Sequence, residues 1–310
     1  MNSTTNSAGL TKQIALVMAS IVVLAGVGLW LVPLHSTGRI SSIVPLTAKG
    51  DPLNGHAMIT VPGGEYWVGA EGDQDNPRRY VKMGGFRIAD TETSNAQFAR
   101  FVEATGYVTD AEKRGWGMSF TEGMLDWEWE QLKGADWRHP FGKGKPGAAE
   151  LPSHPVTQIS GADALAYCLW LGARLPTIEE WEVAARAGST NLFPWGPEFD
   201  PQRANVWNGE NHHKNTLEDG FRFTSPVRSF PANALGLYDV IGNVFEYCSG
   251  FSATRSYGET NNLISGRGGS WWCSAGTCNS FNLVTIGAMD IHGSLCNQGF
   301  RIVMPAEPSM

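Results

Sequence analysis

Two cysteines near the C-terminus are the residues of this sequence best suited to chemistry. Cys273 and Cys278 lie five positions apart, behind a paired glycine at 268–269 and a doubled tryptophan at 271–272. As thiolates they could bind a soft metal such as Cu(I), or attack a disulfide or another electrophile. A disulfide between them is the alternative, and outside the cytosol this is the commoner fate of two nearby cysteines. Zinc is not indicated, because a structural site needs four nitrogen or sulfur ligands and no second Cys/His pair has suitable spacing.

The chain that carries these thiols has the composition of a globular protein. Its 310 residues can bury one large core or two small cores, and they are 42% hydrophobic and 17% charged. The net charge of -7 and the lack of a basic stripe give no electrostatic reason for nucleic-acid binding, so we expect no nucleic-acid partner. The 37 glycines, 17 prolines and 12 tryptophans predict many turns and much irregular backbone, held by large aromatic anchors.

The N-terminal 36 residues differ from the rest. Ile14 to Val32 is an uncharged apolar run of 19 residues, about the length that crosses a bilayer as a helix. A cleaved signal peptide is the alternative, but no convincing small-x-small cleavage site follows the run. We therefore expect residues 1–36 to form a tail and membrane anchor or signal, with the bulk of the chain on the periplasmic or extracellular side. Residues 37–57 read as a linker, and 58–306 as the folded domain.

Local patterns predict a mixed fold within that domain. Alternating apolar residues around the Pro-Gly-Gly turn at 62–64 predict a hairpin, and a capped helix is expected after Ser94. Ser160 to Gly172 is a second capped helix, for which we expect Leu165 and Leu169 on the buried side. A third helix starts at a capping box, Thr177 with Glu180. Between 115 and 155 regular patterning fails, so the fold class is α+β with high coil content.

Two loops are rich in oxygen donors. The first pairs Asn205-Val206 with Glu218-Asp219-Gly220-Phe221, and the second runs from Gly236 to Tyr247 with Asp239 and Glu246 seven positions apart. Calcium takes six to eight oxygens from carboxylates, amides and backbone carbonyls, and loops that return on themselves can supply them. Asp-Gly is equally a turn signal, so a plain turn is the alternative reading of the first loop.

Several sequence blocks, in order from Met58 to Met304, resemble the formylglycine-generating enzymes, also called sulfatase-modifying factors. The blocks are residues 134–140, 174–182, 267–278 and 297–301. The resemblance implies the fold of that family, with a C-type-lectin-like core. It also implies a copper-dependent enzyme that uses O2 to oxidise a cysteine of a client protein to formylglycine, with Cu(I) held by two protein thiolates and the client sulfur as a third ligand.

The resemblance also assigns roles to individual residues. Cys273 and Cys278 match the copper ligands, Ser270 matches a serine three residues before the first, and Asn297 falls nineteen residues after the second. Where the family usually has Trp-Glu-Trp beside its oxygen pocket, this chain has Phe245-Glu246-Tyr247. Two structural Ca2+ sites are implied, one at Asn205, Val206, Asp219 and Phe221, and one at Asp239, Gly242, Val244 and Glu246.

The segment 279–292 departs from the family, because it lacks the Arg and Tyr residues that grip the client there. We therefore expect the client to be an exported protein or peptide, sulfatase-like or another periplasmic enzyme, without the ordinary sulfatase motif. Met289 and His292 in this segment could add further ligands near copper. Two alternative functions stay open: a non-catalytic maturation or binding module for a periplasmic enzyme, and an oxidase of a peptide or siderophore-type precursor. Cys248 and Cys296 match no family disulfide and could pair with each other.

Overall fold

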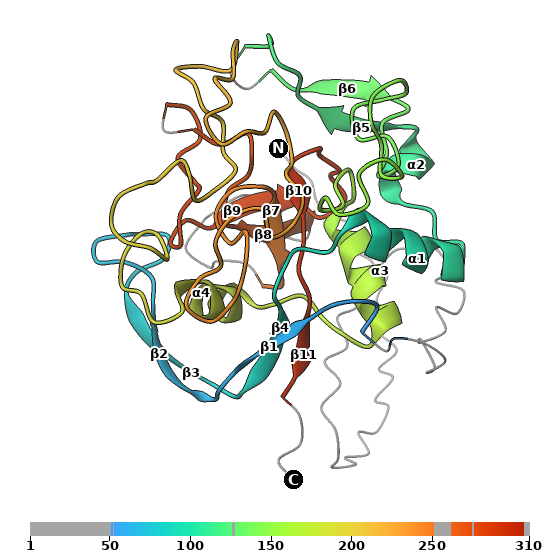
Figure 1. Cartoon of the computed structure of the whole chain (residues 1–310). Coiled ribbons are helices and arrows are strands. Elements are labelled where there is room, and N and C mark those ends of the chain that lie inside the picture. Colours follow the sequence, from blue (N-terminus) through green and yellow to red (C-terminus); the bar gives the residue numbers. More distant parts are fainter. Residues whose placement is uncertain (1–50, 52, 126–127, 251–261, 275, 307–310) are drawn as a thin grey trace, which may run out of the picture. The chain divides into compact units, whose positions relative to one another are not determined.

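The computed structural model describes residues 51, 53–125, 128–250, 262–274 and 276–306 (Figure 1). The apolar run 14–32 and most of the predicted linker lie outside these residues. Within the described part of the chain, no helix is both long and apolar enough to cross a membrane. Short helices and short strands alternate with long irregular segments, which confirms the mixed α and β fold predicted from the sequence.

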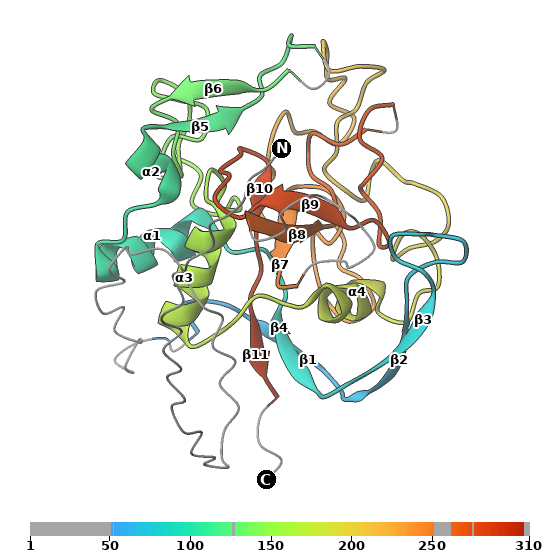
Figure 2. The same cartoon turned by 180° about the vertical axis from the view of Figure 1, so that it is seen from behind.

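The described strands form four small sheets (Figures 1 and 2). One sheet has the order β1 (Met58–Val61), β4 (Phe86–Ala89), β11 (Val303–Pro305), and a second has the order β10 (Gln298–Gly299), β7 (Phe245–Cys248), β8 (Leu263–Arg267), β9 (Gly287–Asp290). Two pairs complete the set: β2 (Gly64–Val68) with β3 (Arg79–Met83), and β5 (Trp116–Ser119) with β6 (Glu130–Lys133). The first sheet therefore joins the first and last strands of the domain.

All four described helices begin with a capping box, in which a Ser or Thr side chain and the third helical residue satisfy each other's backbone amides. The caps predicted at Ser94, Ser160 and Thr177 are confirmed. Thr109 caps a short helix that the sequence did not predict. The helices are α1 (Asn95–Thr105), α2 (Asp110–Arg114), α3 (Gly161–Leu171) and α4 (Ile178–Arg186).

The hairpin predicted around the Pro-Gly-Gly turn is wrong. β1 pairs with β4 and β2 pairs with β3, so the chain leaves one sheet at Pro62 and enters another at Gly64. At this crossing a Cβ on Gly63 would lie 2.9 Å from the backbone nitrogen of Gly85. The glycines therefore allow two backbone segments to approach closely, and do not form a hairpin turn.

The buried face predicted for α3 is also wrong in part. Leu165 and Leu169 are 40% and 58% exposed, while Ala164, Tyr167 and Cys168 face the core. The helix is apolar on nearly every side, so periodicity does not determine its orientation. Polar contacts of the Tyr167 hydroxyl with Asn54 and His56 help to determine the orientation of the helix. Cys168 is a free buried thiol, as predicted.

The core consists of two hydrophobic clusters. One contains Trp181, Trp271 and Trp272 together with both candidate thiols, and the other contains Phe98 and Tyr167 with residues of α1 and α3. Ion pairs are buried beside this apolar material. Such pairs are costly to desolvate, so each buried charge needs a complete set of partners.

Glu182 on α4 is such a charge, and its partners come from distant parts of the chain. It accepts hydrogen bonds from the guanidinium groups of Arg267 at 2.8 Å and Arg186 at 2.7 Å, from Asn76 at 2.7 Å and from the amide of Gly69 at 2.6 Å. Burial alone would raise the pKa of Glu182, but the charges of Arg267 and Arg186 outweigh it and the pKa is lowered.

We expect Glu182→Gln to lower the free energy of unfolding by about 3–5 kcal/mol, because it leaves the buried Arg267 unpaired. Since the pKa of Glu182 is lowered on folding, its contribution is present above the unfolded-state pKa and is lost as pH falls through the folded-state pKa. Urea denaturation at several pH values measures both effects. Glu179→Gln is the control: it breaks a partly exposed bridge to Arg79 and should cost at most about 1 kcal/mol. Equal losses in the two variants would contradict the prediction.

Candidate functional site

A tight bend after β8 positions the two cysteines. Gly269 has a φ of 77°, and a Cβ there would lie 2.5 Å from the Cα of Phe281, so only glycine fits. The carbonyl of Cys273 then accepts a hydrogen bond of 2.9 Å from the amide of Trp207. The segment that carries the cysteines is thereby attached to the first oxygen-rich loop.

Four predicted residues meet at this bend. The sulfur atoms of Cys273 and Cys278 lie 2.6 Å apart, and both residues are buried. The Ser270 Oγ lies 3.8 Å from the Cys273 sulfur and accepts a hydrogen bond of 3.0 Å from the side-chain amide of Asn297. The Asn297 Oδ1 is buried and has no hydrogen-bond partner among the described residues. The arrangement leaves one polar acceptor available beside a pair of sulfur atoms.

The two thiols differ in acidity. Burial, together with the neighbouring Cys278, raises the pKa of Cys273 well above its usual value. The hydrogen bond from Cys273 lowers the pKa of Cys278 to about 7, against the opposing effect of burial. Cys278 is also the more accessible residue, at 8% exposed against 0% for Cys273. Cys278 is therefore the thiol of the pair that ionises first, and Cys273 keeps its proton to higher pH.

Aromatic rings surround Trp272, which directly precedes Cys273. His212 stacks on Trp272 with ring centroids 4.3 Å apart, and Trp129 and Phe120 contact Trp272 at 5.4 and 5.7 Å. His212 also forms a 2.7 Å hydrogen bond to the Trp272 carbonyl. This packing excludes water from one side of the thiol pair.

The two aromatic residues predicted beside an oxygen pocket lie in β7. Tyr247 is fully buried in the second core cluster, and its hydroxyl donates to the Ile159 carbonyl at 3.0 Å and to Gln298 Oε1 at 2.8 Å. Burial raises the pKa of Tyr247. Phe245 is partly buried and packs against both clusters. The structure therefore places Phe245 nearer to the thiol cluster than Tyr247.

The first predicted calcium loop is closed by hydrogen bonds of Asp219. Its carboxylate accepts from the amides of Val206 at 3.0 Å and Phe221 at 2.9 Å, and burial raises its pKa to about 6. Asn205 lies beside them but donates its side-chain amide to the Phe223 carbonyl at 2.8 Å. The four predicted residues thus share one loop, and their oxygens are of the kind that calcium prefers.

The second predicted calcium loop contains an oxygen that no other described residue satisfies. Asp239 is buried, its Oδ2 accepts from the Arg228 amide at 2.7 Å, and its Oδ1 has no partner among the described residues. Glu92, which the sequence did not single out, also has a buried Oε1 with no partner among the described residues. Burial raises the pKa of Asp239 to about 7, and burial together with the charge of Asp239 raises the pKa of Glu92 well above its usual value. Two uncompensated carboxyl oxygens fit a cation that is not part of the polypeptide.

Glu246, the remaining predicted carboxylate, is already paired. It accepts from Arg301 at 2.5 and 2.6 Å and from the Trp181 indole at 2.7 Å. The same loop contains Gly242 and Val244, whose backbone carbonyls were predicted as calcium ligands. Gly242 has a φ of 78° there. Within the described residues there is no group of three or more His, Cys, Asp or Glu side chains that could alone hold a metal ion. A calcium site here would therefore need backbone carbonyls as well.

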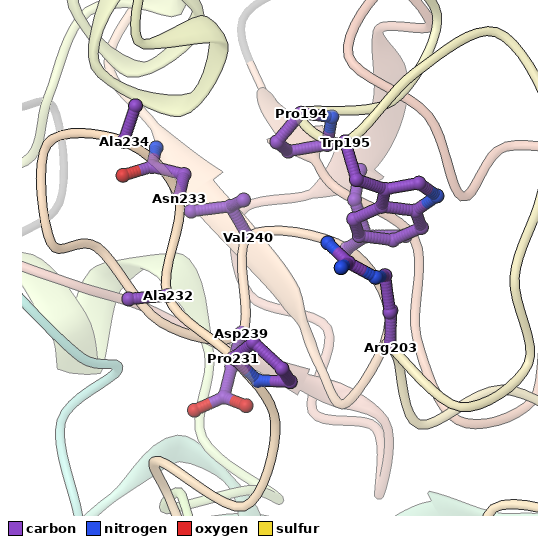
Figure 3. A pocket seen from close by; sticks show the side chains of 10 residues that line it. Pro194, Trp195, Arg203, Pro231, Ala232, Asn233, Ala234, Asp239 and Val240 are labelled. Carbon is purple, nitrogen blue, oxygen red and sulfur yellow. The ribbon is translucent and has the colours of Figure 1, made fainter.

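A hollow of about 160 Å³ lies next to this second loop (Figure 3). Its lining includes Trp195, Arg203 and Asp239, and the Arg203 guanidinium is 5.9 Å from the centre of the Trp195 ring. None of the four residues at the thiol bend is among the described residues that line it. The hollow therefore belongs to the second loop and not to the thiol pair.

The remaining candidates lie apart from the thiol pair. Met289 packs in the second core cluster against Gly266, and His292 pairs with Asp110 at 3.0 Å. Cys248 and Cys296 are both free and buried, and burial raises the pKa of each, for Cys296 to about 12. The pairing of Cys248 with Cys296 considered from the sequence is thus absent from the structure, and both behave as packed thiols.

We expect iodoacetamide to modify Cys278 before any other thiol of the reduced protein. The rate should rise as pH increases through about 7, because the thiolate is the reactive form and Cys278 has the lowered pKa. Peptide mapping by mass spectrometry measures the modified fraction at each cysteine. The buried thiols Cys168, Cys248 and Cys296 serve as internal controls and should stay unmodified in the folded protein. Faster modification of any of these three would refute the assignment.

Residues 46–306 match the sulfatase-modifying factor enzyme 1-like domain. The formylglycine-generating enzyme of Mus musculus is 39% identical over 290 residues, covering 83% of this chain and 77% of that protein. The inactive Cα-formylglycine-generating enzyme 2 of the same species is 36% identical, covering 81% and 86%. PvdO from Pseudomonas aeruginosa shares the fold, with a TM-score of 0.59, 23% identity and coverage of 80% and 94%. This chain therefore belongs to the formylglycine-generating enzyme family.

Proposed function

We propose that this protein is a copper-dependent oxidase that uses O2 to convert a cysteine of an exported protein or peptide client to formylglycine. The observation that supports this most directly is the contact between the Cys273 and Cys278 sulfurs, with Ser270 and Asn297 beside them. Membership of the family adds a relative named formylglycine-generating enzyme at 39% identity. It also includes an inactive relative, so family membership alone does not establish activity.

The residues present suit a monovalent copper ion. Cu(I) selects soft thiolate ligands, and Cys273 and Cys278 would supply two of them from one bend. Two protein sulfurs leave room for a third sulfur from the client. When bound, copper would supply the redox chemistry with O2.

The protein's own part in this reaction is binding, orientation and exclusion of water. Ser270 is held by the Asn297 amide, so its Oγ stays directed toward the Cys273 sulfur. The aromatic packing around Trp272 keeps that side dry, which strengthens electrostatic interactions at the site. Because Cys273 is protonated near neutral pH, metal binding must displace its proton, and affinity should increase with pH.

We expect the reduced protein to bind one Cu(I), and Cys273→Ser or Cys278→Ser to lower the affinity at least about 100-fold, because each removes one of two soft ligands. Competition with a chromogenic Cu(I) chelator measures the affinity, and metal analysis measures the stoichiometry. Cys168→Ser is the matched control and should bind copper like the unaltered protein, because Cys168 lies in the other core cluster. If the control and the two site variants bound copper equally well, the copper assignment would be abandoned.

Calcium is the second proposed cofactor, and its role is structural. We propose one ion at Asn205, Val206, Asp219 and Phe221, and another at Asp239, Gly242, Val244 and Glu246. The orphaned oxygens of Asp239 and Glu92 favour the second position in particular, because a cation would compensate both. We therefore add Glu92 to the donors near the second ion.

Removal of calcium with EGTA should lower the melting temperature by several degrees, because a ligand that binds only the folded state stabilises it. Asp239→Asn should bind calcium more weakly and show a smaller response to EGTA. Asp200→Asn is the control, since Asp200 lies at the surface in a bridge to Arg203. Thermal melts with and without added calcium provide the measurement. An unaltered protein with the same melting temperature in calcium and in EGTA would contradict both calcium sites.

We further propose that residues 14–32 anchor the protein in a membrane, with the domain and its client on the periplasmic or extracellular side. Two other functions remain candidates for the same fold, a non-catalytic maturation or binding module and an oxidase of a peptide or siderophore-type precursor. The inactive relative motivates the first. Oxygen consumption with a cysteine-containing client peptide distinguishes the formylglycine-generating oxidase from the binding module. Copper-dependent oxygen uptake supports the oxidase. No oxygen uptake by the copper-bound protein favours the binding module.

A further inference from the structure

The outer face of α3 presents apolar side chains to solvent. Leu165 and Leu169 lie one turn apart and are 40% and 58% exposed. The only charged residue of the helix is Asp163, which is fully buried and caps the first turn. A surface helix of a globular protein normally carries polar residues on its outer side, so this face has an unusual composition.

The segment that precedes α2 packs against the first turn of α3. The Tyr107 hydroxyl lies 3.0 Å from Asp163, and the Ser160 hydroxyl lies 2.8 Å from Asp110. We call the exposed Leu165 and Leu169 the α3 patch.

The start of the folded domain is attached to the same helix. The Tyr167 hydroxyl on α3 accepts a hydrogen bond from the Asn54 side chain at 2.8 Å and contacts the His56 ring nitrogen at 2.8 Å. The 21 residues 33–53 separate Asn54 from the apolar run that ends at Val32. A segment of that length reaches at most roughly 75 Å, so a membrane that held the run would stay within reach of α3.

We propose that the α3 patch rests on the lipid bilayer in which the N-terminal run is anchored. This inference rests on the proposed anchor. Two side chains offer far less area than the roughly 800 Å² per partner that a stable dimer needs. A weak contact of this size becomes populated when a tether holds it at millimolar effective concentration. An apolar surface without a basic cluster fits the uncharged lipid interface better than an anionic one.

The position of the thiol pair agrees with such an orientation. In both views the thiol-bearing segment that follows β8 and the helices α1 and α3 lie on opposite sides of strands β7 to β9 (Figures 1 and 2). A domain that rests on α3 would leave the thiol side facing away from the bilayer. A client could then reach Cys278 from the aqueous compartment.

The test uses the full chain in phosphatidylcholine vesicles that contain lipids brominated near the headgroup. A fluorophore is attached to Leu169→Cys, in a Cys278→Ser background so that the reactive native thiol takes no label. Leu125→Cys in the same background is the matched control, since Leu125 is 52% exposed but lies between β5 and β6. We expect several-fold stronger quenching by brominated lipid at position 169 than at position 125. Adding Leu165→Asp should reduce quenching at 169 to the control level, because a charge opposes insertion.

Flotation with the vesicles is measured first, so that anchor and patch are tested separately. A chain that does not float with the vesicles overturns the tether, and with it the proposal. A chain that floats but shows equal quenching at both positions overturns the patch alone. Shielding of the probe at 169 that depends on protein concentration and not on brominated lipid would show a second copy as the occupant, which also overturns the proposal. None of these outcomes depends on copper or on the activity of the thiol pair.

Discussion

The side-chain amide of Asn243 joins the parts of this structure that the proposed chemistry needs. Its Oδ1 accepts from the Asn205 side chain at 3.1 Å and the Ser225 amide at 2.9 Å, and its Nδ2 donates to Glu92 at 3.1 Å. Its backbone carbonyl accepts from Trp271 at 3.0 Å. One buried residue thus connects the first oxygen-rich loop, the buried carboxylates and the segment that carries the cysteines.

This role follows from the high coil content of the fold. Irregular backbone cannot satisfy its own amides and carbonyls, so buried side chains must supply the missing partners. Asn243 adopts a φ of 57°, a left-handed conformation that asparagine tolerates better than most residues. The same reasoning applies to a cation between Asp239 and Glu92, which would provide what the backbone does not.

Local rules predicted local structure well, and failed where packing partners decide. The caps at Ser94, Ser160 and Thr177 depend on neighbouring residues only, so short sequence patterns were enough. The hairpin prediction was wrong because β1 pairs with β4 and not with β2, the next strand in the sequence. The buried side of α3 was predicted wrongly because a helix that is apolar on most sides can bury any of them. The hydrogen bond between Tyr167 and Asn54 helps to determine which side faces the core.

The thiol site was predictable to the extent that its residues are close in sequence or belong to the family pattern. Ser270, Cys273 and Cys278 share one bend, and Asn297 joins them as the resemblance implied. Glu92 and Asn243 were missed, because single Glu and Asn residues carry no distinctive spacing. The Gly242-Asn243 pair within an apolar stretch was the available signal, since such a pair often marks a left-handed turn.

The last residues of the domain are also among its most central. β11 pairs with β4 in the first sheet, and Arg301 is the buried partner of Glu246. During synthesis from the N-terminus, neither group exists until nearly the whole domain has been made. Until residues 301–305 have been made, the chain lacks the edge strand of its first sheet and the cation for its buried acid, so the domain cannot complete its core. Only partial structure can therefore form before this final segment of the domain has left the ribosome.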